Sequence, residues 1–166
     1  MKSVLTTLCY IERDGKYLML HRTKKKNDPS HDLWLGLGGH FERGESPEDC
    51  VKREVLEESG LTMNNPQLRG IVTFSDENFY EYMFLFSCKD FCGELNSCDE
   101  GELCWVEKDR VFNELPIWTG DRVFLKLMDM GEPFFSLKLT YFKKELICTE
   151  LNGKPADPDE IIRGVL

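Results

Sequence analysis

Three glutamates, Glu54, Glu57 and Glu58, stand at positions i, i+3 and i+4 of a segment with helical character. At this spacing their carboxylates share one face of a helix, where they repel each other. A hard divalent cation removes that repulsion and takes carboxylate oxygens as ligands. The spacing therefore predicts a metal site on this face. The alternative is a solvated acidic surface.

The residues on either side specify where this helix begins and ends. Ser46 suits the N-cap position, and Pro47 suits the first helical position, where a missing N–H costs nothing. Asp49 lies three residues after the cap and approximates a capping box. Gly60 suits the left-handed position that follows a helix. We therefore expect a helix from about residue 47 to residue 59.

Other residues of the segment have predicted supporting roles. Arg53 lies one turn before Glu57 and could orient its carboxylate. Glu45, in the preceding loop, is a candidate partner for Arg53. Val51 and Val55 are one helical turn apart and form an apolar stripe that would anchor the helix to a core.

The stretch 39–61 reads GHFERGESPEDCVKREVLEESGL and matches G-x5-E-x7-R-E-U-x-E-E-x-G-U, with U aliphatic, at every position. This pattern is the Nudix box, so the chain resembles the Nudix hydrolases. Members of that family cleave nucleoside diphosphates linked to another group and use a divalent metal. The resemblance implies an α/β fold, the Nudix α/β/α sandwich, in which a mixed β-sheet lies between helices.

The resemblance also implies a cofactor and a set of site residues. The cofactor would be Mg²⁺, with Mn²⁺ as a substitute; a bound ion of this kind neutralises phosphate oxygens and acidifies a water. The predicted metal ligands are Gly39, through its backbone carbonyl, Glu54, Glu57 and Glu58. The predicted catalytic residues are Glu57, Glu58, Glu100 and Arg53. Which carboxylate is the general base stays open, and Glu100 in CDEGELCW has a surface-turn acid as its alternative.

Within the family, the chain is most similar to the MutT-type enzymes, which hydrolyse oxidised purine nucleoside triphosphates. The stretches DLWLGLGGHFERGES, CDEGELCW and IWTGD follow segments of that group. The resemblance assigns base stacking to Trp118 and base-edge binding to Asp121; a core tryptophan and an early-helix acid are the alternatives. Leu35 stands where the group has an asparagine, and Gly120 where it has another acid. Arg22, at a strand end, is a substrate-binding candidate or a surface arginine.

Two classes of function follow from these residues. The first is a Mg²⁺-dependent pyrophosphohydrolase that cleaves a nucleoside triphosphate, such as 8-oxo-dGTP or a related oxidised purine nucleotide, to a monophosphate and pyrophosphate. Hydrolysis of ADP-ribose or of a nucleotide sugar is the enzymatic alternative. The second class is a nucleotide-sensing module that does not turn its ligand over.

Composition limits the partners. The chain has 166 residues, a net charge of −9 and a pI near 4.9. Proteins that bind nucleic-acid polymers carry basic patches, so we expect a small nucleotide as the partner instead. An acidic pocket still accepts phosphates when metal ions are bound. The sequence leaves the oligomeric state open.

The length predicts one domain over residues 1–166, and the resemblance implies that it is a Nudix domain. The first 15 residues lack the apolar core and cleavage site of a signal peptide. No run of 18 apolar residues is present, so we expect no membrane segment and a cytoplasmic protein. Seven scattered cysteines without a C-x-x-C pair favour reduced thiols, and a zinc site at 88–104 is the alternative.

Periodicity predicts the remaining elements. Strands are expected at 5–11, 17–21, 67–74, 79–87, 101–107, 134–142 and 144–151. Helical segments are expected at 111–115 and 118–130, and a turn at 13–16. The loop 23–32 carries three lysines, which serve solubility or steer phosphates. The glycine-rich approach 34–39 permits close backbone contact. The polar tail from about 154 to 166 is expected to be mobile.

Overall fold

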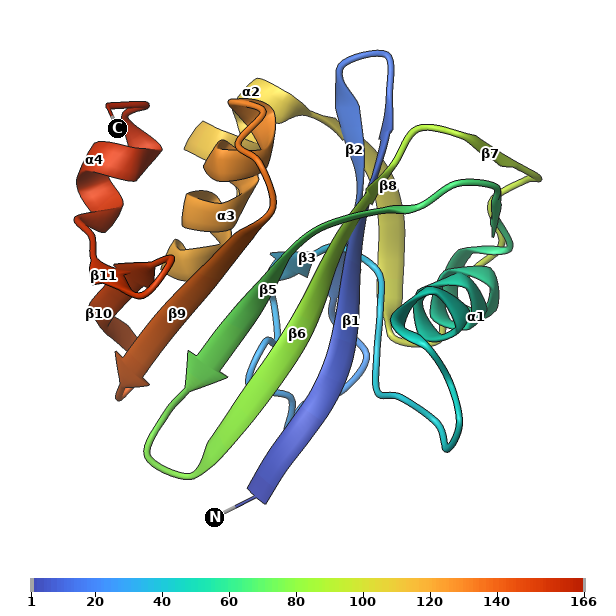
Figure 1. Ribbon diagram of the computed structural model, residues 1–166. Helices are drawn as coiled ribbons and strands as arrows, with labels where there is room; N and C mark the ends of the chain where they lie inside the picture. The colour runs from blue at the N-terminus through green and yellow to red at the C-terminus, as the bar shows by residue number, and fades with distance from the viewer. Residues whose placement is uncertain (1, 166) are drawn as a thin grey trace. The chain divides into compact units, whose positions relative to one another are not determined.

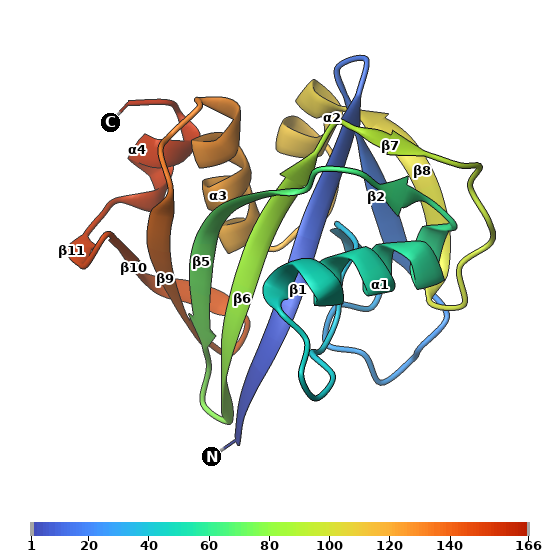
Figure 2. The same ribbon diagram turned by 45° about the vertical axis from the view of Figure 1, so that its right-hand side comes forward.

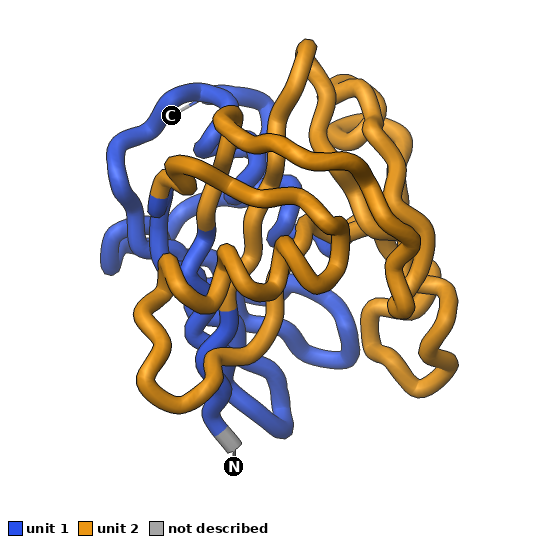
Figure 3. The backbone as a smooth tube through the Cα atoms, turned by 90° about the vertical axis from the view of Figure 1, so that its right-hand side faces the viewer, with its two compact units in different colours: residues 1–6, 68–85, 118–166 blue, residues 7–67, 86–117 orange. Residues whose placement is uncertain are grey.

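The computed structural model describes residues 2–165, which divide into two compact units. The first unit comprises residues 1–6, 68–85 and 118–166, and the second unit comprises residues 7–67 and 86–117 (Figure 3). Each unit therefore combines segments that are far apart in the sequence. The expectation of one domain over the whole chain stays a prediction.

Runs of strands are separated by helices along the chain (Figure 1). The strands are β1 (Lys2–Arg13), β2 (Lys16–Arg22), β3 (Trp34–Leu35), β4 (Thr62–Met63), β5 (Gln67–Ser75), β6 (Phe79–Cys88), β7 (Phe91–Cys92), β8 (Gly101–Glu107), β9 (Phe135–Phe142), β10 (Glu145–Leu151) and β11 (Lys154–Pro155). The helices are α1 (Pro47–Ser59), α2 (Lys108–Asn113), α3 (Thr119–Asp129) and α4 (Pro158–Ile162).

The first unit contains a mixed sheet with strand order β11-β10-β9-β5-β6. Strand β9 pairs antiparallel with β10 and parallel with β5. Alternate residues of β9 are buried, because successive side chains of a strand point to opposite faces. The buried residues of β9 are Phe135, Leu137, Leu139 and Tyr141. This unit has its own core, to which β9 contributes one face.

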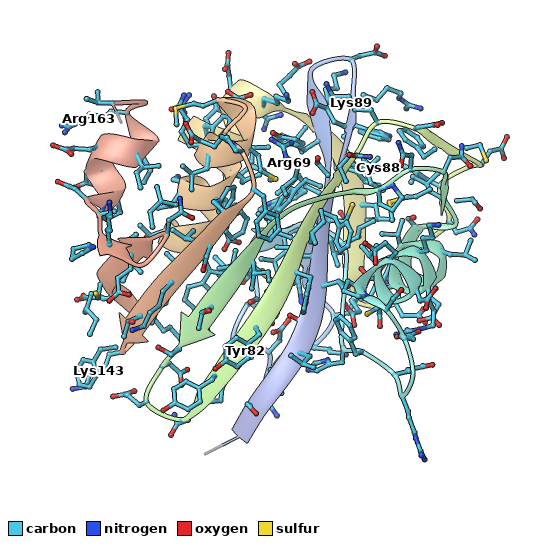
Figure 4. The ribbon with its side chains drawn as sticks, in the orientation of Figure 1. Arg69, Tyr82, Cys88, Lys89, Lys143 and Arg163 are labelled. Carbon is cyan, nitrogen blue, oxygen red and sulfur yellow. The ribbon has the colours of Figure 1, made fainter. Side chains whose placement is uncertain are left out.

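Helix α3 completes that core. It buries Val123, Phe124 and Leu127 and packs against β10 and α4. Arg69 of β5, which Figure 4 labels, donates a hydrogen bond of 3.1 Å to the Met128 carbonyl near the end of α3. The helix is thereby fixed to the sheet by both apolar packing and a backbone contact.

The polar tail is ordered, which corrects our expectation of mobility. It forms β11, which pairs with β10, and then α4. Asp157 caps α4 by accepting from the Asp159 N–H, and Pro158 takes the first helical position. Ile161 is 1% exposed. A single buried apolar side chain in a capped turn holds the segment, and the polar composition of the tail hid this signal.

The second unit is built on a hairpin of β1 and β2. Asp14 and Gly15 form its turn with φ values of 52° and 74°, as expected for an Asp-Gly hairpin. Strand β2 also pairs antiparallel with β3 and with β8. The hairpin prediction is therefore confirmed, and β8 coincides with the predicted strand at 101–107.

Helix α1 follows the predicted boundaries. Ser46 accepts from the Asp49 N–H while the Asp49 carboxylate accepts from the Ser46 N–H, so the capping box is present. Gly60 ends the helix with φ 79°. Val51 and Val55 are fully buried, which confirms the apolar stripe. In Figure 2 the helix runs across β1, and the Thr7 hydroxyl of β1 lies 3.5 Å from the Cys50 sulfur of the helix.

Other elements depart from expectation in detail. Helix α2 begins at Lys108, three residues before the predicted turn at 111–115. The two-residue strands β4 and β7, which pair with each other, were not predicted. Segments this short carry too few residues to show a period. All seven cysteines are free thiols, and no helix within residues 2–165 is long and apolar enough to cross a membrane.

Candidate active site

The loop before α1 lies directly on strand β1. The Thr7 N–H donates to the Gly39 carbonyl at 2.9 Å, and Cys9 and Leu37 exchange two backbone hydrogen bonds. A Cβ atom on Gly38 would lie 1.9 Å from the Thr7 carbonyl oxygen. Only glycine permits this approach. The glycine-rich stretch therefore fixes the position of the loop that leads into the box.

Arg53 is the centre of the ion pairs on α1. Its guanidinium donates to both oxygens of Glu45, at 2.5 and 3.0 Å, which is a bidentate pair. It also donates to Glu54 at 2.9 Å and to Glu57 at 3.4 Å. The bond from Arg53 lowers the pKa of Glu45 to about 2. The predicted contacts of Arg53 with Glu45 and Glu57 are both present.

Glu58 differs from its neighbours because it is 9% exposed. Burial, together with the charges of Glu100 and Glu54, raises its pKa to about 9. Its carboxyl group shares a hydrogen bond with Glu54, and the Gly38 N–H donates to it. The charges of Glu54 and of Glu100, which lies in a loop beyond the helix, thus both act on Glu58. Of the proposed ligands, Glu57 lies furthest out, since its side chain is 59% exposed.

Gly39 is in close contact with this cluster. A Cβ atom on Gly39 would lie 2.5 Å from the carboxyl carbon of Glu54. Its carbonyl accepts from the Thr7 N–H at 2.9 Å and from the Cys50 thiol at 3.7 Å, so both lone pairs of this oxygen are engaged. The prediction that Gly39 is a metal ligand stays a prediction.

The oxygen-rich composition of the cluster fits a hard divalent cation. Within residues 2–165, no three His, Cys, Asp or Glu side chains are arranged so as to hold a metal ion as they stand. The carboxylates of the cluster are instead engaged in the contacts described above. Arg53 is bonded to Glu54 and Glu57, and Glu54 is also bonded to Glu58. These bonds reduce the mutual repulsion of the carboxylates.

Glu100 reaches the cluster from the loop before β8. Arg22 donates to it at 3.2 Å and Lys25 at 3.4 Å. Arg22 also pairs with Asp28 at 2.5 Å, and the side chain of Asp28 is only 10% exposed. Lys24 donates to the Cys98 carbonyl. The lysine loop is therefore bonded to the turn at 98–100.

Leu35 lies in the short strand β3. It pairs with Leu20 of β2 and is half-buried. Next to it, Trp34 stacks on His21 with ring centroids 4.5 Å apart and nearly parallel planes. The Trp34 N–H donates to the Pro116 carbonyl. Leu35 thus lies on an ordered strand, and its role toward a substrate stays a prediction.

Trp118 and Asp121 belong to the first unit. Trp118 is half-buried and packs edge-on against Phe74 and Tyr141, at centroid distances of 6.4 and 5.4 Å. Asp121 is 8% exposed, and its Oδ2 atom has no hydrogen-bond partner among the described residues. Burial, and next the charge of Glu81, raises the pKa of Asp121 to about 8. Trp118 therefore lies in an aromatic cluster, and Asp121 is a buried neutral acid beside it.

Comparison with known proteins decides the family. The NUDIX domain profile matches residues 2–128. This chain belongs to the Nudix family. It is 34% identical over 141 residues to the uncharacterized Nudix hydrolase YvcI of Bacillus subtilis, covering 81% of this chain and 85% of that protein. It is 31% identical over 144 residues to the oxidized purine nucleoside triphosphate hydrolase of Danio rerio, covering 85% and 86%.

A solved structure gives the same result for the fold. The MutT protein from Bacillus halodurans aligns with a TM-score of 0.79 at 31% identity and covers 92% of this chain and 99% of that one. The predicted fold class, a Nudix α/β/α sandwich with a mixed sheet, is confirmed. As a Nudix hydrolase, the protein acts on phosphoanhydride bonds, and enzymes of this family generally use divalent metal ions.

Sequence reasoning missed Asp28, Lys25 and the Gly38 N–H as parts of the site. Lys25 was weighed only as part of a charged run. Asp28 and Gly38 carry no spacing signal, because their partners are more than five residues away in sequence or on another element. Asp-Pro at 28–29 marks a turn but does not indicate which arginine the carboxylate will meet.

Proposed function

We propose that this Nudix hydrolase is a Mg²⁺-dependent pyrophosphohydrolase that converts a nucleoside triphosphate to a nucleoside monophosphate and pyrophosphate. The observation that carries the proposal is the set of ion pairs that joins Arg53 to Glu45, Glu54 and Glu57, next to the buried Glu58 on which the charge of Glu100 acts. The similarity to the Danio rerio enzyme supports the nucleoside triphosphate class, with an oxidised purine such as 8-oxo-dGTP as the first candidate.

The metal ligands of the proposal are the Gly39 carbonyl and the carboxylates of Glu54, Glu57 and Glu58. Bound there, Mg²⁺ or Mn²⁺ would neutralise phosphate oxygens and acidify a water. The chain itself supplies orientation. Arg53 fixes the direction of Glu54 and Glu57, and the bidentate bond to Glu45 fixes Arg53. An arginine held in this way keeps the carboxylates in place when their mutual repulsion changes.

A carboxylate must take the proton of the attacking water. Glu57, Glu58 and Glu100 remain the candidates for this general base. The contacts of Glu100 support its candidacy, because its ion pairs with Arg22 and Lys25 fix the position of its carboxylate. The same contacts support a positioning role for Arg22, in addition to the substrate contact predicted from the sequence.

The residues proposed to recognise the base are Trp118 and Asp121. A half-buried tryptophan supports stacking, which tolerates any base. A buried acid without a partner supports hydrogen bonding to a base edge, since an unsatisfied polar group is costly unless a ligand completes it. Leu35 is proposed as an apolar contact to the base where related enzymes of the MutT type have a polar one.

The test is a Mg²⁺-dependent release assay that separates pyrophosphate from orthophosphate. The substrates are 8-oxo-dGTP, dGTP, dATP, dCTP, ADP-ribose and UDP-glucose. Pyrophosphate release from a triphosphate, fastest with 8-oxo-dGTP, is the expected result. Cleavage of ADP-ribose or UDP-glucose alone would refute the triphosphate assignment and establish the enzymatic alternative. Glu48→Gln, an exposed first-turn glutamate of α1, is the matched control for variants of the box.

A further inference from the structure

Asp121 is a buried acid that the first unit does not satisfy. Its Oδ2 atom is inaccessible to solvent and has no hydrogen-bond partner among residues 2–165. Buried polar groups in native proteins are nearly always bonded, so an exception calls for an explanation. Burial raises the pKa of this carboxyl, which favours the protonated form that can donate as well as accept. A ligand with a carbonyl oxygen would use that donor.

The position before it is closed to a second acid. A Cβ atom on Gly120 would lie 2.7 Å from the Tyr141 hydroxyl and 2.5 Å from a methyl carbon of Leu139. The Gly120 N–H in turn donates to that hydroxyl at 2.8 Å. A side chain at position 120 would have to displace both neighbours. A second acid acts on Asp121 from another element.

Glu81 on β6 is such an acid. Its charge acts on Asp121, and it accepts a 2.7 Å hydrogen bond from the Thr6 hydroxyl of β1. Along β6 it shares a face with Phe79, because residues two apart in a strand point the same way. Phe79 stacks on Phe74, which contacts Trp118. Tyr82, labelled in Figure 4, has the opposite direction and is 42% exposed.

Glu81 therefore belongs to the same face as the aromatic cluster. It is half-buried, and Thr6 is 5% exposed. A threonine hydroxyl that donates to one oxygen fixes the direction of the carboxylate and leaves the other oxygen available. No other described contact of the first unit uses that second oxygen for a hydrogen bond.

We infer that Glu81 is a specificity-determining residue, whose carboxylate accepts the N–H groups at the edge of a guanine-type base while Asp121 donates to the carbonyl oxygen beside them. An ionised carboxylate only accepts hydrogen bonds, and the guanine edge offers two adjacent N–H donors next to an oxygen. Adenine offers one exocyclic donor and no oxygen. The inference rests on the proposed nucleoside triphosphate hydrolysis and names the base class of its substrate.

The experiment compares wild type, Glu81→Gln and the control Glu145→Gln in steady-state pyrophosphate release. Glu145 is an exposed glutamate on β10 of the same unit. The substrates are 8-oxo-dGTP, dGTP, dITP, which lacks the 2-amino group, and dATP. Loss of a charged hydrogen bond should raise KM for the guanine substrates roughly ten- to hundredfold with kcat nearly unchanged. The rise should be smaller for dITP and smallest for dATP, and the control should match wild type.

Thr6→Val is a second variant that leaves the carboxylate in place but frees its direction. It should raise KM for the guanine substrates in the same order, by a smaller factor. Thermal melting of each variant separates a loss of fold from a loss of recognition. If Glu81→Gln has the same relative KM values for the four substrates as wild type, the inference is overturned while the proposed function stays intact. An equal fall of kcat for all substrates would also overturn it. Absence of pyrophosphate release in wild type would instead refute the proposed function itself.

Discussion

The acidic side chains of the second unit and those of the first unit have different surroundings. Glu45 in the loop before α1 and Glu54 and Glu57 on α1 all bond to one guanidinium, that of Arg53. Glu100, further along the chain, has Arg22 and Lys25. Asp121 in the first unit is 8% exposed, its Oδ2 atom has no hydrogen-bond partner among residues 2–165, and the charges of Glu81 and Arg122 act on it.

This difference corresponds to two kinds of ligand. Charged carboxylates can bind a metal ion. The bound metal ion would in turn attract the charged phosphates of a substrate. A carboxyl that burial keeps neutral cannot hold an ion well, but it can donate a hydrogen bond to a neutral group. Under the proposed function, the second unit would therefore bind the charged part of the substrate and the first unit its uncharged base. Four variants test this contrast.

The largest effect is expected from Glu57→Gln. Glu57 is exposed, so the fold should persist, while the loss of a proposed metal ligand should lower kcat by roughly a hundredfold or more. The test measures kcat of the variant and of wild type for 8-oxo-dGTP at saturating Mg²⁺, and circular dichroism verifies the fold. Near-normal turnover would remove Glu57 from the ligand set.

Arg53→Lys should have the next largest effect. Lysine keeps the charge but cannot form the bidentate bond to Glu45 and still reach Glu54. We expect kcat to fall about ten- to hundredfold, as for other residues that orient metal ligands, with a higher Mg²⁺ requirement. A Mg²⁺ titration of activity measures both. Full activity with an unchanged Mg²⁺ midpoint would mean that charge alone matters at this position.

Trp118→Ala should raise KM about tenfold and change kcat little, because base stacking contributes roughly 1–3 kcal/mol. Phe74→Leu, which alters the neighbour of Trp118 and keeps an apolar side chain, is the comparison variant. If KM stays at the wild-type value and only the melting temperature falls, Trp118 is a core residue and the first unit loses its proposed role in base binding.

The smallest effect concerns stability and pH. Asp121 has an ordinary pKa of 3.8 and a folded-state pKa of about 8. Below pH 3.8 the carboxyl of Asp121 is protonated in both the folded and the unfolded state. Between pH 3.8 and about 8 it stays protonated in the folded state only. The free energy of unfolding should therefore fall as pH rises through this window, by at most about 1.4 kcal/mol per pH unit. In Asp121→Asn this contribution should vanish, which urea titrations at pH 6 and 7 would detect as a difference of about 1 kcal/mol. Parallel pH slopes in both proteins would contradict a neutral Asp121.

Local signals in the sequence were sufficient for α1. Ser46, Pro47 and Gly60 act on their immediate neighbours, and the capping box and the turn at Gly60 follow from a few bonds. The Asp-Gly hairpin and the long strands were predictable for the same reason. The contact between Arg53 and Glu57 is set by helix geometry alone.

Contacts between distant segments were not predictable. Thr6 and Glu81 are 75 residues apart, and Arg22 and Glu100 are 78 apart. Which strands become neighbours, and in which register, decides these pairs, and no spacing in the sequence encodes that. The effect of Glu100 on Glu58 has the same origin, because it depends on where the loop with Glu100 lies.

The small helix α4 has a practical consequence for handling the protein. It packs on α3 and places Ile161 in the interior. A Cβ atom on Gly164, just after α4, would lie 3.4 Å from the side chain of Lys126 on α3. Shortening the chain before Pro158 would strip an apolar cover from α3 and leave that surface open to self-association. Expression designs should therefore retain the segment through α4 and place any affinity tag behind a spacer.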